Sequence, residues 1–463
     1  MDIEKSLIPP GATLADTMGV IDRARTGLAL ALGPSGRLVG VISDGDIRRA
    51  ILRGAHLSDA TDCYLVRDVL TLPTDYTARE RDFLLDHPTF SNRSPRWIPL
   101  LDQHGRPRDL ISSGDLIAAS SAAARPSAHT YPRPPLVTVL GGAGYIGSVL
   151  VRQLLEEGYR VRVFDQLYYD ETSLAEVRSH PRFEMVIGNV RHSDEVVPAL
   201  VDSDAVVHLA ELVGDPLCAH NPVMTFEVNY LATASIVLAC QYLQVNRFVY
   251  ISSCSVYGAS REPETILTEG SPLSPVSLYA KLKVEAEQFI LQRAAGAFAP
   301  CILRLGTIFG LSPRPRFDLV VNTLTAQAVQ DGAITVFGGD QWRPHVHVSD
   351  VARAIRRCLA LPLETIRGEV FNIVTENLTV DDVARLVIEE VPTATLTRSD
   401  TVVDRRNYRV SAEKARRILG FDPQVSVRDG IREVATALTS SRLASYTNPA
   451  YSNILTFTTK GFS

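Results

Sequence analysis

The chain lacks an excess of basic residues, because 47 Lys and Arg stand against 52 Asp and Glu and leave a net charge of -5. This balance gives no positive field, so neither nucleic acid nor an anionic membrane is expected as a partner. No run of 18 apolar residues occurs, so no membrane span is expected. The opening segment, MDIEKSLIPP, lacks the basic start and apolar stretch of a signal peptide. These absences favour a cytoplasmic protein.

Cysteine is sparse, and the six cysteines form no CxxC pair; they stand at positions 63, 218, 240, 254, 301 and 358. In a chain of this size, scattered cysteines indicate buried reduced thiols and not a disulfide framework or a zinc site. The pair His345-x-His347 has no further ligands at suitable spacing, so we expect no metal site.

A length of 463 residues exceeds one ordinary core, so two or three domains are expected. Small residues and prolines in SSAAARPSAHTYPRPP cannot bury a core and indicate a linker. We therefore expect a front module at 1–122, a linker at 123–135, a main domain at 136–440 and a tail at 441–463. The tail has aromatic and β-branched residues but no polar face, so we expect it to dock on a subunit.

The front module contains a weak internal repeat, in which RLVGVISDGDIRRAIL is echoed by RPRDLISSGDLIAAS. Each copy reads as a short strand, a Ser-x-Gly-Asp turn and a helix, and each follows another strand that ends in a glycine turn. Such self-similarity indicates two copies of one supersecondary unit packed face to face.

This repeat resembles a tandem pair of cystathionine-β-synthase (CBS) domains. The family's [Ser/Thr]-x-x-Asp turn is matched by Ser43 with Asp46 and by Ser112 with Asp115. The resemblance implies an α/β module that holds an adenosine nucleotide at these turns and regulates the protein or its assembly. The plainer alternative is that serine and aspartate only cap the helices that follow.

The main domain opens on PLVTVLGGAGYIGSVLVRQLLEEGYRVRVFDQ, which reads as one strand–helix–strand unit. Its glycines fall at Gly141, Gly144 and Gly147, as in a dinucleotide fingerprint. The first permits a tight turn, the second lets backbone approach a pyrophosphate, and the third lets the helix lie close to the sheet. The pyrophosphate would rest on the positive end of the helix, at Tyr145 and Ile146.

Asp165 follows Gly147 by 18 residues, at the end of the next strand. Its carboxylate can accept from both ribose hydroxyls of NAD and would repel the 2′-phosphate of NADP. NAD is therefore the expected cofactor, although Arg160 and Arg162 lie close in sequence. Asn189 and Val190 end the third strand, and the family resemblance that the later motifs complete implies that they lie at the adenine.

Further along stand Asn229 in FEVNYLAT, Ser253 at the end of RFVYISS, and Tyr279 with Lys283 in SLYAKLKVEAE. The last two are four residues apart and share one helix face. From Leu136 to Leu438 this order of motifs resembles the extended short-chain dehydrogenase/reductase family, in its branch of nucleotide-sugar epimerases and dehydratases. The resemblance implies a Rossmann-type doubly wound α/β fold with a smaller substrate-binding subdomain, and a homodimer or higher homo-oligomer.

The roles of these residues follow from this resemblance and from acid–base chemistry. The ammonium of Lys283 and the positive nicotinamide ring favour the phenolate of Tyr279, which would lower its pKa and let it take a proton from a sugar hydroxyl. Ser253 would hydrogen-bond that oxygen, Lys283 would also bind the nicotinamide ribose, and Asn229 would order a relay water. The segment AVVHLAELVGDP resembles the family's HLAA segment, which implies Leu209 and Ala210 at the cofactor.

Cys254 and Ser255 stand where the family's dehydratases carry Asp-Glu and its decarboxylases keep a glutamate. Neither residue is a useful acid or base at neutral pH, which argues against dehydration and decarboxylation. Simple redox at one carbon remains, and we favour C4 epimerisation. The alternative is an NAD(P)H-dependent 4-ketoreductase or dehydrogenase of nucleotide sugars, and a non-catalytic sensor of NAD and adenylate is a second one.

The nucleotide-sugar end of the site is expected in two later segments, LRLGTIFGLSPRPRFDLVVN and GGDQWRPHVHVSDVARAI. They supply Asn322 and Arg343, and the resemblance implies that Arg343 clamps the substrate diphosphate, which suits a planar guanidinium. Arg406, with Arg409 beside it, is a further expected donor. The sugar and the base are left open.

Overall fold

The computed structural model describes residues 3–24, 26–67, 69–85, 97–113, 116, 134–169, 172–258, 265–399, 406–440, 443 and 445–460. The chain divides into two compact units, Met1–Pro134 and Pro135–Ser463. The predicted linker at 123–135 lies outside the described residues, apart from its last two prolines.

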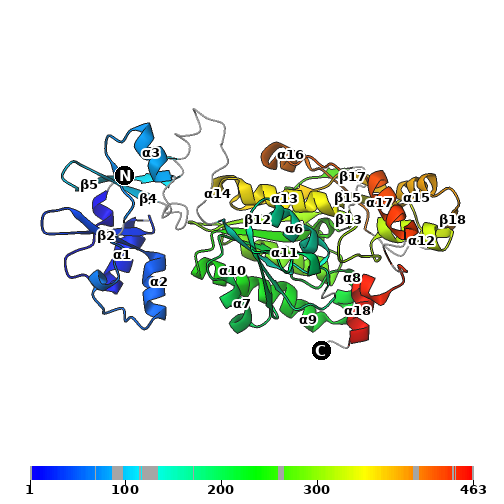
Figure 1. Ribbon diagram of the computed structural model, residues 1–463, viewed down its shortest axis with the longest axis horizontal. Coiled ribbons are helices and arrows are strands. Elements are labelled where there is room, and N and C mark those ends of the chain that lie inside the picture. Colours follow the sequence, from blue (N-terminus) through cyan, green and yellow to red (C-terminus); the bar gives the residue numbers. More distant parts are fainter. Residues whose placement is uncertain are drawn as a thin grey trace. The chain divides into compact units, whose positions relative to one another are not determined.

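The first unit is built from two α/β segments (Figure 1). One contains α1 (Leu14–Ala24), β1 (Leu28–Leu32), β2 (Leu38–Ser43) and α2 (Asp44–Leu52); the other contains β3 (Leu72–Pro73), α3 (Ala78–Leu85), β4 (Trp97–Leu101) and β5 (Pro107–Ser112). The repeat seen in the sequence is visible in the register. The hairpins β1–β2 and β4–β5 are both antiparallel, and the pairing register of each shifts at the last residue pair before its turn.

The second unit contains a seven-stranded sheet in the order β16-β12-β10-β9-β6-β7-β8, with every pairing parallel. The strands are β6 (Leu136–Leu140), β7 (Arg160–Asp165), β8 (Phe183–Ile187), β9 (Ala205–His208), β10 (Arg247–Ser253), β12 (Ala299–Leu305) and β16 (Glu369–Ile373). The order reverses between β6 and β9. A ligand of such a sheet binds outside the carboxyl ends of the strands at this point.

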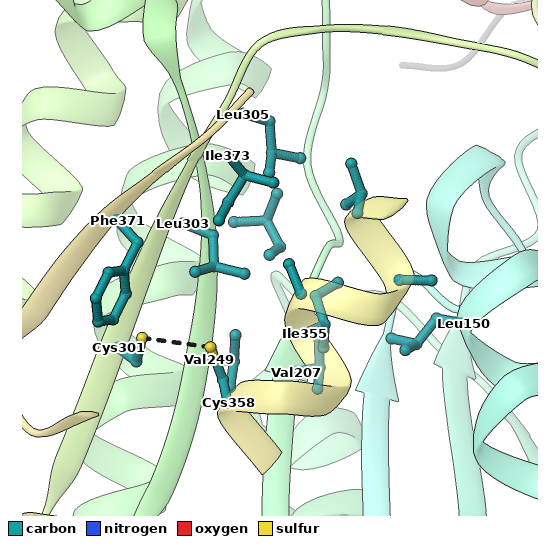
Figure 2. Packing of buried hydrophobic residues seen from close by; sticks show 14 of the residues in the cluster. Leu150, Val207, Val249, Cys301, Leu303, Leu305, Ile355, Cys358, Phe371 and Ile373 are labelled. Carbon is teal, nitrogen blue, oxygen red and sulfur yellow. Dashed lines mark hydrogen bonds between the residues drawn. The ribbon is translucent and has the colours of Figure 1, made fainter. Parts of the chain in front are cut away.

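Helices cover both faces of the sheet, which is why β6, β9 and β12 are buried along their whole length. α6 (Tyr145–Glu156) and α13 (Val348–Ala360) pack on one face, and α7 (Ser193–Leu200), α10 (Thr233–Tyr242) and α11 (Leu278–Leu291) pack on the other. Figure 2 shows the first face, where Leu150 and Ile355 from the helices meet Val207, Val249 and Leu303 from the strands. The fold class expected from the sequence is confirmed for this unit.

All six cysteines are free, as predicted, although Cys63 is exposed and not buried. The sulfur atoms of Cys301 and Cys358 lie 3.8 Å apart in the core. A dashed line joins them in Figure 2.

A smaller subdomain lies beside the sheet and has its own core. Its strands form two small sheets, β13 (Thr307–Phe309) with β15 (Trp342–His347) and β17 (Glu376–Thr379), and β14 (Ala333–Phe337) with β18 (Thr395–Ser399). Its helices are α12 (Val320–Gln330), α15 (Val380–Glu390) and α17 (Val427–Thr439). The chain also forms α14 (Leu363–Ile366), which packs against β12, and α16 (Glu413–Leu419), which packs against β16 and α13. The short strands β11 (Ile266–Leu267) and β19 (Arg409–Val410) form a parallel pair.

Two further segments border the carboxyl ends of the strands. After β9 come α8 (Asp215–His220), α9 (Pro222–Phe226) and a π-helical turn, Glu227–Ala232, which continues into α10. Late in the chain, α18 (Asn453–Lys460) packs against α8, and its Phe457 is buried in the core beneath α10 and α11. The tail therefore docks as expected, on its own chain.

One helix among the described residues, Pro222–Tyr242, is long and apolar enough to pass as a membrane span. Half of its apolar window is buried inside the fold, which is the pattern of a core helix. Its outward face still carries Val223, Phe226, Leu231 and Leu238 in exposed positions.

Candidate active site

A cavity of about 870 Å³ lies at the carboxyl ends of the strands, where the strand order reverses. Its size is within the range of small-molecule and cofactor sites. Its wall includes the glycine turn after β6, Asp165 after β7, Asn189 and Val190 after β8, and Leu209 and Ala210 after β9. Sequence reasoning placed each of these residues at the cofactor.

The glycine turn fits a dinucleotide because side chains are sterically excluded there. Gly141 has a φ of 82°, and a Cβ on it would lie 2.7 Å from the backbone nitrogen of Ala210. A Cβ on Gly147 would lie 2.5 Å from the carbonyl oxygen of Gly141. The first turn of α6 has no side-chain cap, and Gly144, Tyr145, Ile146 and Gly147 all line the cavity. Uncapped helix N–H groups of this kind receive a phosphate.

Asp165 is held in place by backbone donors, since Ala143 and Leu167 donate to its two carboxylate oxygens at 2.9 and 2.8 Å. Burial raises the pKa of this carboxyl group, and these hydrogen bonds oppose the shift. Arg162 is committed elsewhere, because its guanidinium bonds to Glu184 and to the carbonyls of Ala199 and Val201. The site therefore suits a ribose with two free hydroxyls.

Ser253, Tyr279 and Lys283 line the same cavity. Ser253 ends β10, and its hydroxyl accepts a hydrogen bond from the Ser255 N–H at 3.1 Å. Tyr279 and Lys283 lie one turn apart on α11, a helix that Ser277 caps through the N–H of Ala280. The Lys283 ammonium lies 5.6 Å from the centre of the Tyr279 ring and donates to the carbonyl of Ile251.

The sequence did not reveal a carboxylate in this wall. Glu211 lines the cavity, forms an ion pair with Lys283, and accepts from the Tyr250 hydroxyl at 2.7 Å. The sequence did offer one indication of Glu211, because it stands where the family's HLAA segment has its second alanine. Burial, and then the charge of Glu211, raise the pKa of Tyr279 well above its ordinary value. Burial and this carboxylate therefore act against the lowering of the Tyr279 pKa that is expected from Lys283 and the positive nicotinamide ring.

Two expected site residues do not line the cavity. Asn229 is buried, and its amide both accepts from and donates to the backbone of Leu212, at 2.9 and 2.8 Å. Asn322 is also buried and bonds to the backbone of Gly310 and to the carbonyl of Arg316. Both amides hold loops that carry wall residues.

Arginines gather at the end of the cavity that faces the subdomain. Arg343 and Arg406, both expected there, line it, and the Arg343 guanidinium donates to the Arg406 carbonyl. Arg314 and Arg316 also line this end of the cavity. They were not predicted from the sequence, although SPRPRF lies within a segment that was expected at the nucleotide-sugar end. Arg316 is paired with Asp318 at 2.8 and 3.0 Å, and Arg314 lies 4.3 Å from the centre of the Tyr169 ring.

Other titratable groups near the site are neutral or committed to structure. Burial lowers the pKa of His208 to about 3, and its Nε2 lies 2.9 Å from the Thr233 hydroxyl. Burial also raises the pKa of the Cys254 thiol, which donates to the carbonyl of Arg304. The part of the chain that the structure describes contains no group of three or more ligands suited to a metal ion.

In the first unit, Ser43 and Asp46 form a capping box at the start of α2. The Ser43 hydroxyl donates to the Asp46 carboxylate at 2.7 Å, and Arg49 pairs with the same carboxylate. Ser112 ends β5, whereas Asp115 lies outside the described residues.

Comparison with known families gives two matches. A model described as the NAD dependent epimerase/dehydratase family matches residues 137–374, and a CBS domain model matches residues 7–53. UDP-glucuronic acid decarboxylase 1 of Arabidopsis thaliana is 30% identical over 306 residues, which are 64% of this chain and 68% of that protein. A putative UDP-glucose 4-epimerase of Methanocaldococcus jannaschii is 27% identical over 311 residues, 65% of this chain and 97% of its own.

Solved structures agree with this pattern. UDP-glucuronic acid 4-epimerase from Bacillus cereus, in complex with UDP-glucuronic acid and NAD, is 25% identical with a TM-score of 0.60 and covers 66% of this chain and 99% of its own. DesIV, a dTDP-glucose 4,6-dehydratase from Streptomyces venezuelae with NAD and TYD bound, is 26% identical with a TM-score of 0.61 and covers 68% and 99%.

Proposed function

The chain belongs to the NAD-dependent epimerase/dehydratase family, and from this premise we propose that it is a nucleotide-sugar epimerase that inverts C4 through a transient keto-sugar. It is an NAD-dependent nucleotide-sugar enzyme of the extended short-chain dehydrogenase/reductase type. NAD, when bound, supplies the acceptor and donor of hydride. The observation that carries the proposal is that Ser253, Tyr279 and Lys283 share one cavity wall with the glycine turn.

Each side chain has a defined task in this proposal. Tyr279 takes the proton from the C4 hydroxyl and returns it, and the Ser253 hydroxyl donates to the same oxygen as it becomes a carbonyl. Lys283 supplies positive charge beside the phenol and binds the ribose next to the reacting carbon. Asn229 acts indirectly, since its bonds to Leu212 hold the loop after β9.

The surroundings of Ser253 support redox without elimination, because loss of water or of carbon dioxide requires a further acid or base. Cys254 points into the core, and burial keeps its thiol protonated. Glu211 is a carboxylate in the wall, but Lys283 and Tyr250 engage its two oxygens. Glu211 is therefore not available as an acid or base for the sugar.

The arginine-rich end of the cavity supports a nucleoside diphosphate as the other half of the substrate. Arg343 and Arg406 are proposed to bind the diphosphate, for which a planar guanidinium is well shaped. Arg314 and Arg316 add positive charge beside them. Asn322 supports this region by holding the loop that carries Arg316.

We include a cytoplasmic location and a homodimer in the proposal. The exposed apolar side chains on the helix that runs from Pro222 to Tyr242 support a dimer, because a partner helix would cover them. We also propose that the CBS-like unit, as a pair over residues 1–122, binds an adenosine nucleotide at Ser43 and Asp46 and at Ser112 and Asp115.

The deciding experiment measures the cofactor that co-purifies with the full-length protein and then the interconversion of UDP-glucose or UDP-glucuronic acid with its C4 epimer. Bound NAD that does not exchange, with turnover and no added reductant, is the expected result. An empty site that requires added NADPH would instead establish the ketoreductase.

Tyr279→Phe tests the base directly and is expected to reduce kcat by at least about a hundredfold. Tyr242→Phe is the matched control, because the Tyr242 hydroxyl is buried on α10 and does not line the cavity. Equal turnover in wild type and Tyr279→Phe would exclude the mechanism. No turnover in any form, with NAD still bound, would favour the sensor.

A further inference from the structure

The Lys283 ammonium is almost fully engaged by neighbours other than Tyr279. It donates to the carbonyl of Ile251, contacts the carboxylate of Glu211, and lies 4.6 Å from the centre of the Tyr250 ring. An ammonium has three N–H donors, so two are used and one is left for the ribose or for Tyr279. The position of Lys283 is therefore fixed from β10 and from the loop after β9.

Glu211 is as deeply buried as the lysine, with 3% of each side chain exposed. A buried ion pair of this kind is weak support for stability, because desolvation of both charges offsets their attraction. An apolar pair could fill the same space. The pair lies in the wall of the cavity beside Tyr279, which indicates a role in the site.

Among the charged groups near Tyr279, Glu211 has the largest effect on its pKa. His208 on β9 is neutral because of its burial, and the Cys218 thiol on α8 stays protonated for the same reason. Glu287, on α11, is paired with Arg304 of β12. Asp215, on α8, and Arg316, from the subdomain side, act on Tyr279 more weakly than Glu211 does.

We propose that Glu211 is a positioning residue that holds the Lys283 ammonium and offsets its charge at the Tyr279 hydroxyl, and so sets the pH at which Tyr279 gives up its proton. A positive charge beside a phenol favours the phenolate, and a carboxylate in contact with that charge cancels most of the effect. Burial and Glu211 together keep Tyr279 protonated until the balance of charge in the cavity changes. Binding of the positively charged nicotinamide ring is such a change.

The inference deepens the proposed function, since it concerns the proton that Tyr279 is proposed to move, and its test reads Tyr279 itself. Full-length wild type and Glu211→Gln are titrated with alkali while tyrosinate absorbance is followed. Each is paired with a version that also carries Tyr279→Phe, because the chain has 15 tyrosines and only the difference reports Tyr279. Glu211→Gln keeps the shape and an acceptor but removes the charge.

The Tyr279 signal is expected to move to lower pH in Glu211→Gln by about one unit or more. Glu211→Asp keeps the charge and is expected to titrate close to wild type. Glu369→Gln is the matched control, because Glu369 pairs with Lys414 at 2.7 Å outside the cavity, and it should leave the signal unchanged. Where the epimerase turns over, the acidic limb of the kcat profile should move with the tyrosinate signal.

A Tyr279 signal that does not move to lower pH in Glu211→Gln, or that moves equally in Glu369→Gln, would overturn the inference. Glu211→Ala is measured in parallel in case the amide disturbs packing. If Glu211→Gln and Glu211→Ala both fail to fold while Glu369→Gln folds, Glu211 serves stability and the inference is wrong. None of these results depends on turnover, so the proposed function can fail separately.

Discussion

The buried ionisable side chains Lys283, Arg304 and His208 are either paired with an opposite charge or neutral. Lys283 pairs with Glu211, and Arg304 makes a two-point contact with Glu287 between β12 and α11. His208 instead remains neutral, because burial penalises its charged form. Around Tyr279, therefore, charge is available only where another residue balances it.

The buried histidines predict a marked sensitivity to acid. Burial lowers the pKa of His208 to about 3 and that of His345 to about 4. Below about pH 6.5 the unfolded chain binds protons at these residues and the folded chain does not, so stability falls as pH falls through this window. The free energy of unfolding, measured with urea between neutral pH and about pH 4, should depend less steeply on pH in His208→Gln than in wild type. The difference should correspond to about one proton. The exposed His192→Gln is the control, and equal slopes for wild type and His208→Gln would contradict the argument.

At the scale of elements, the tail closes one side of the cavity. Tyr451 accepts from the N–H of Phe317 at 2.9 Å, and the N–H of Asn453 donates to Asp318 at 3.1 Å. The Asn453 side chain donates to the carbonyl of Val213 at 3.2 Å and lines the cavity. α18 thereby ties the loop after β9 to the segment that carries Arg314 and Arg316.

Asn453→Ala should weaken this connection without removing any reacting group. We expect KM for the nucleotide sugar to rise about fivefold while kcat and NAD affinity change little, since one neutral hydrogen bond is worth about 1 kcal/mol. Steady-state kinetics measure the two parameters separately. Thr458→Ala, on the exposed side of the same helix, is the control. A fall in kcat with unchanged KM would show that the tail does not act through substrate binding.

At the scale of the whole molecule, the chain joins a catalytic unit to a unit that contains a CBS domain. In the first unit, the Ser43 and Asp46 side chains already cap α2. The same capping geometry occurs at α1, where Thr13 and Asp16 exchange the equivalent hydrogen bonds. Capping alone therefore does not distinguish a nucleotide site from an ordinary helix start.

This likeness supplies a matched pair of variants for the full-length protein. ATP, ADP or AMP is expected to change the melting temperature and the activity of wild type. Ser43→Ala and Thr13→Ala should each cost about 1 kcal/mol through loss of a cap, but only Ser43→Ala should abolish the nucleotide response. If no adenosine nucleotide alters melting or activity in wild type, the regulatory proposal fails.

The sequence alone determined the architecture of the catalytic unit and most of its cofactor wall. Gly141, Gly147 and Asp165 could be read because their roles depend on local backbone geometry and on their order along one strand–helix–strand unit. Tyr279 and Lys283 could be read because a spacing of four places two side chains on one helix face.

Only the tertiary structure decided which side chains face the cavity and which charges meet there. Glu211 and Lys283 are 72 residues apart in sequence, and the packing of α11 against β10 brings Lys283 to Glu211 in the loop after β9. The bonds that turn Asn229 and Asn322 away from the cavity, and the contact of Asn453 with the cavity wall, likewise depend on packing between distant segments. The interaction between charges weakens with distance, so the protonation state of Tyr279 follows from that packing and not from the motif.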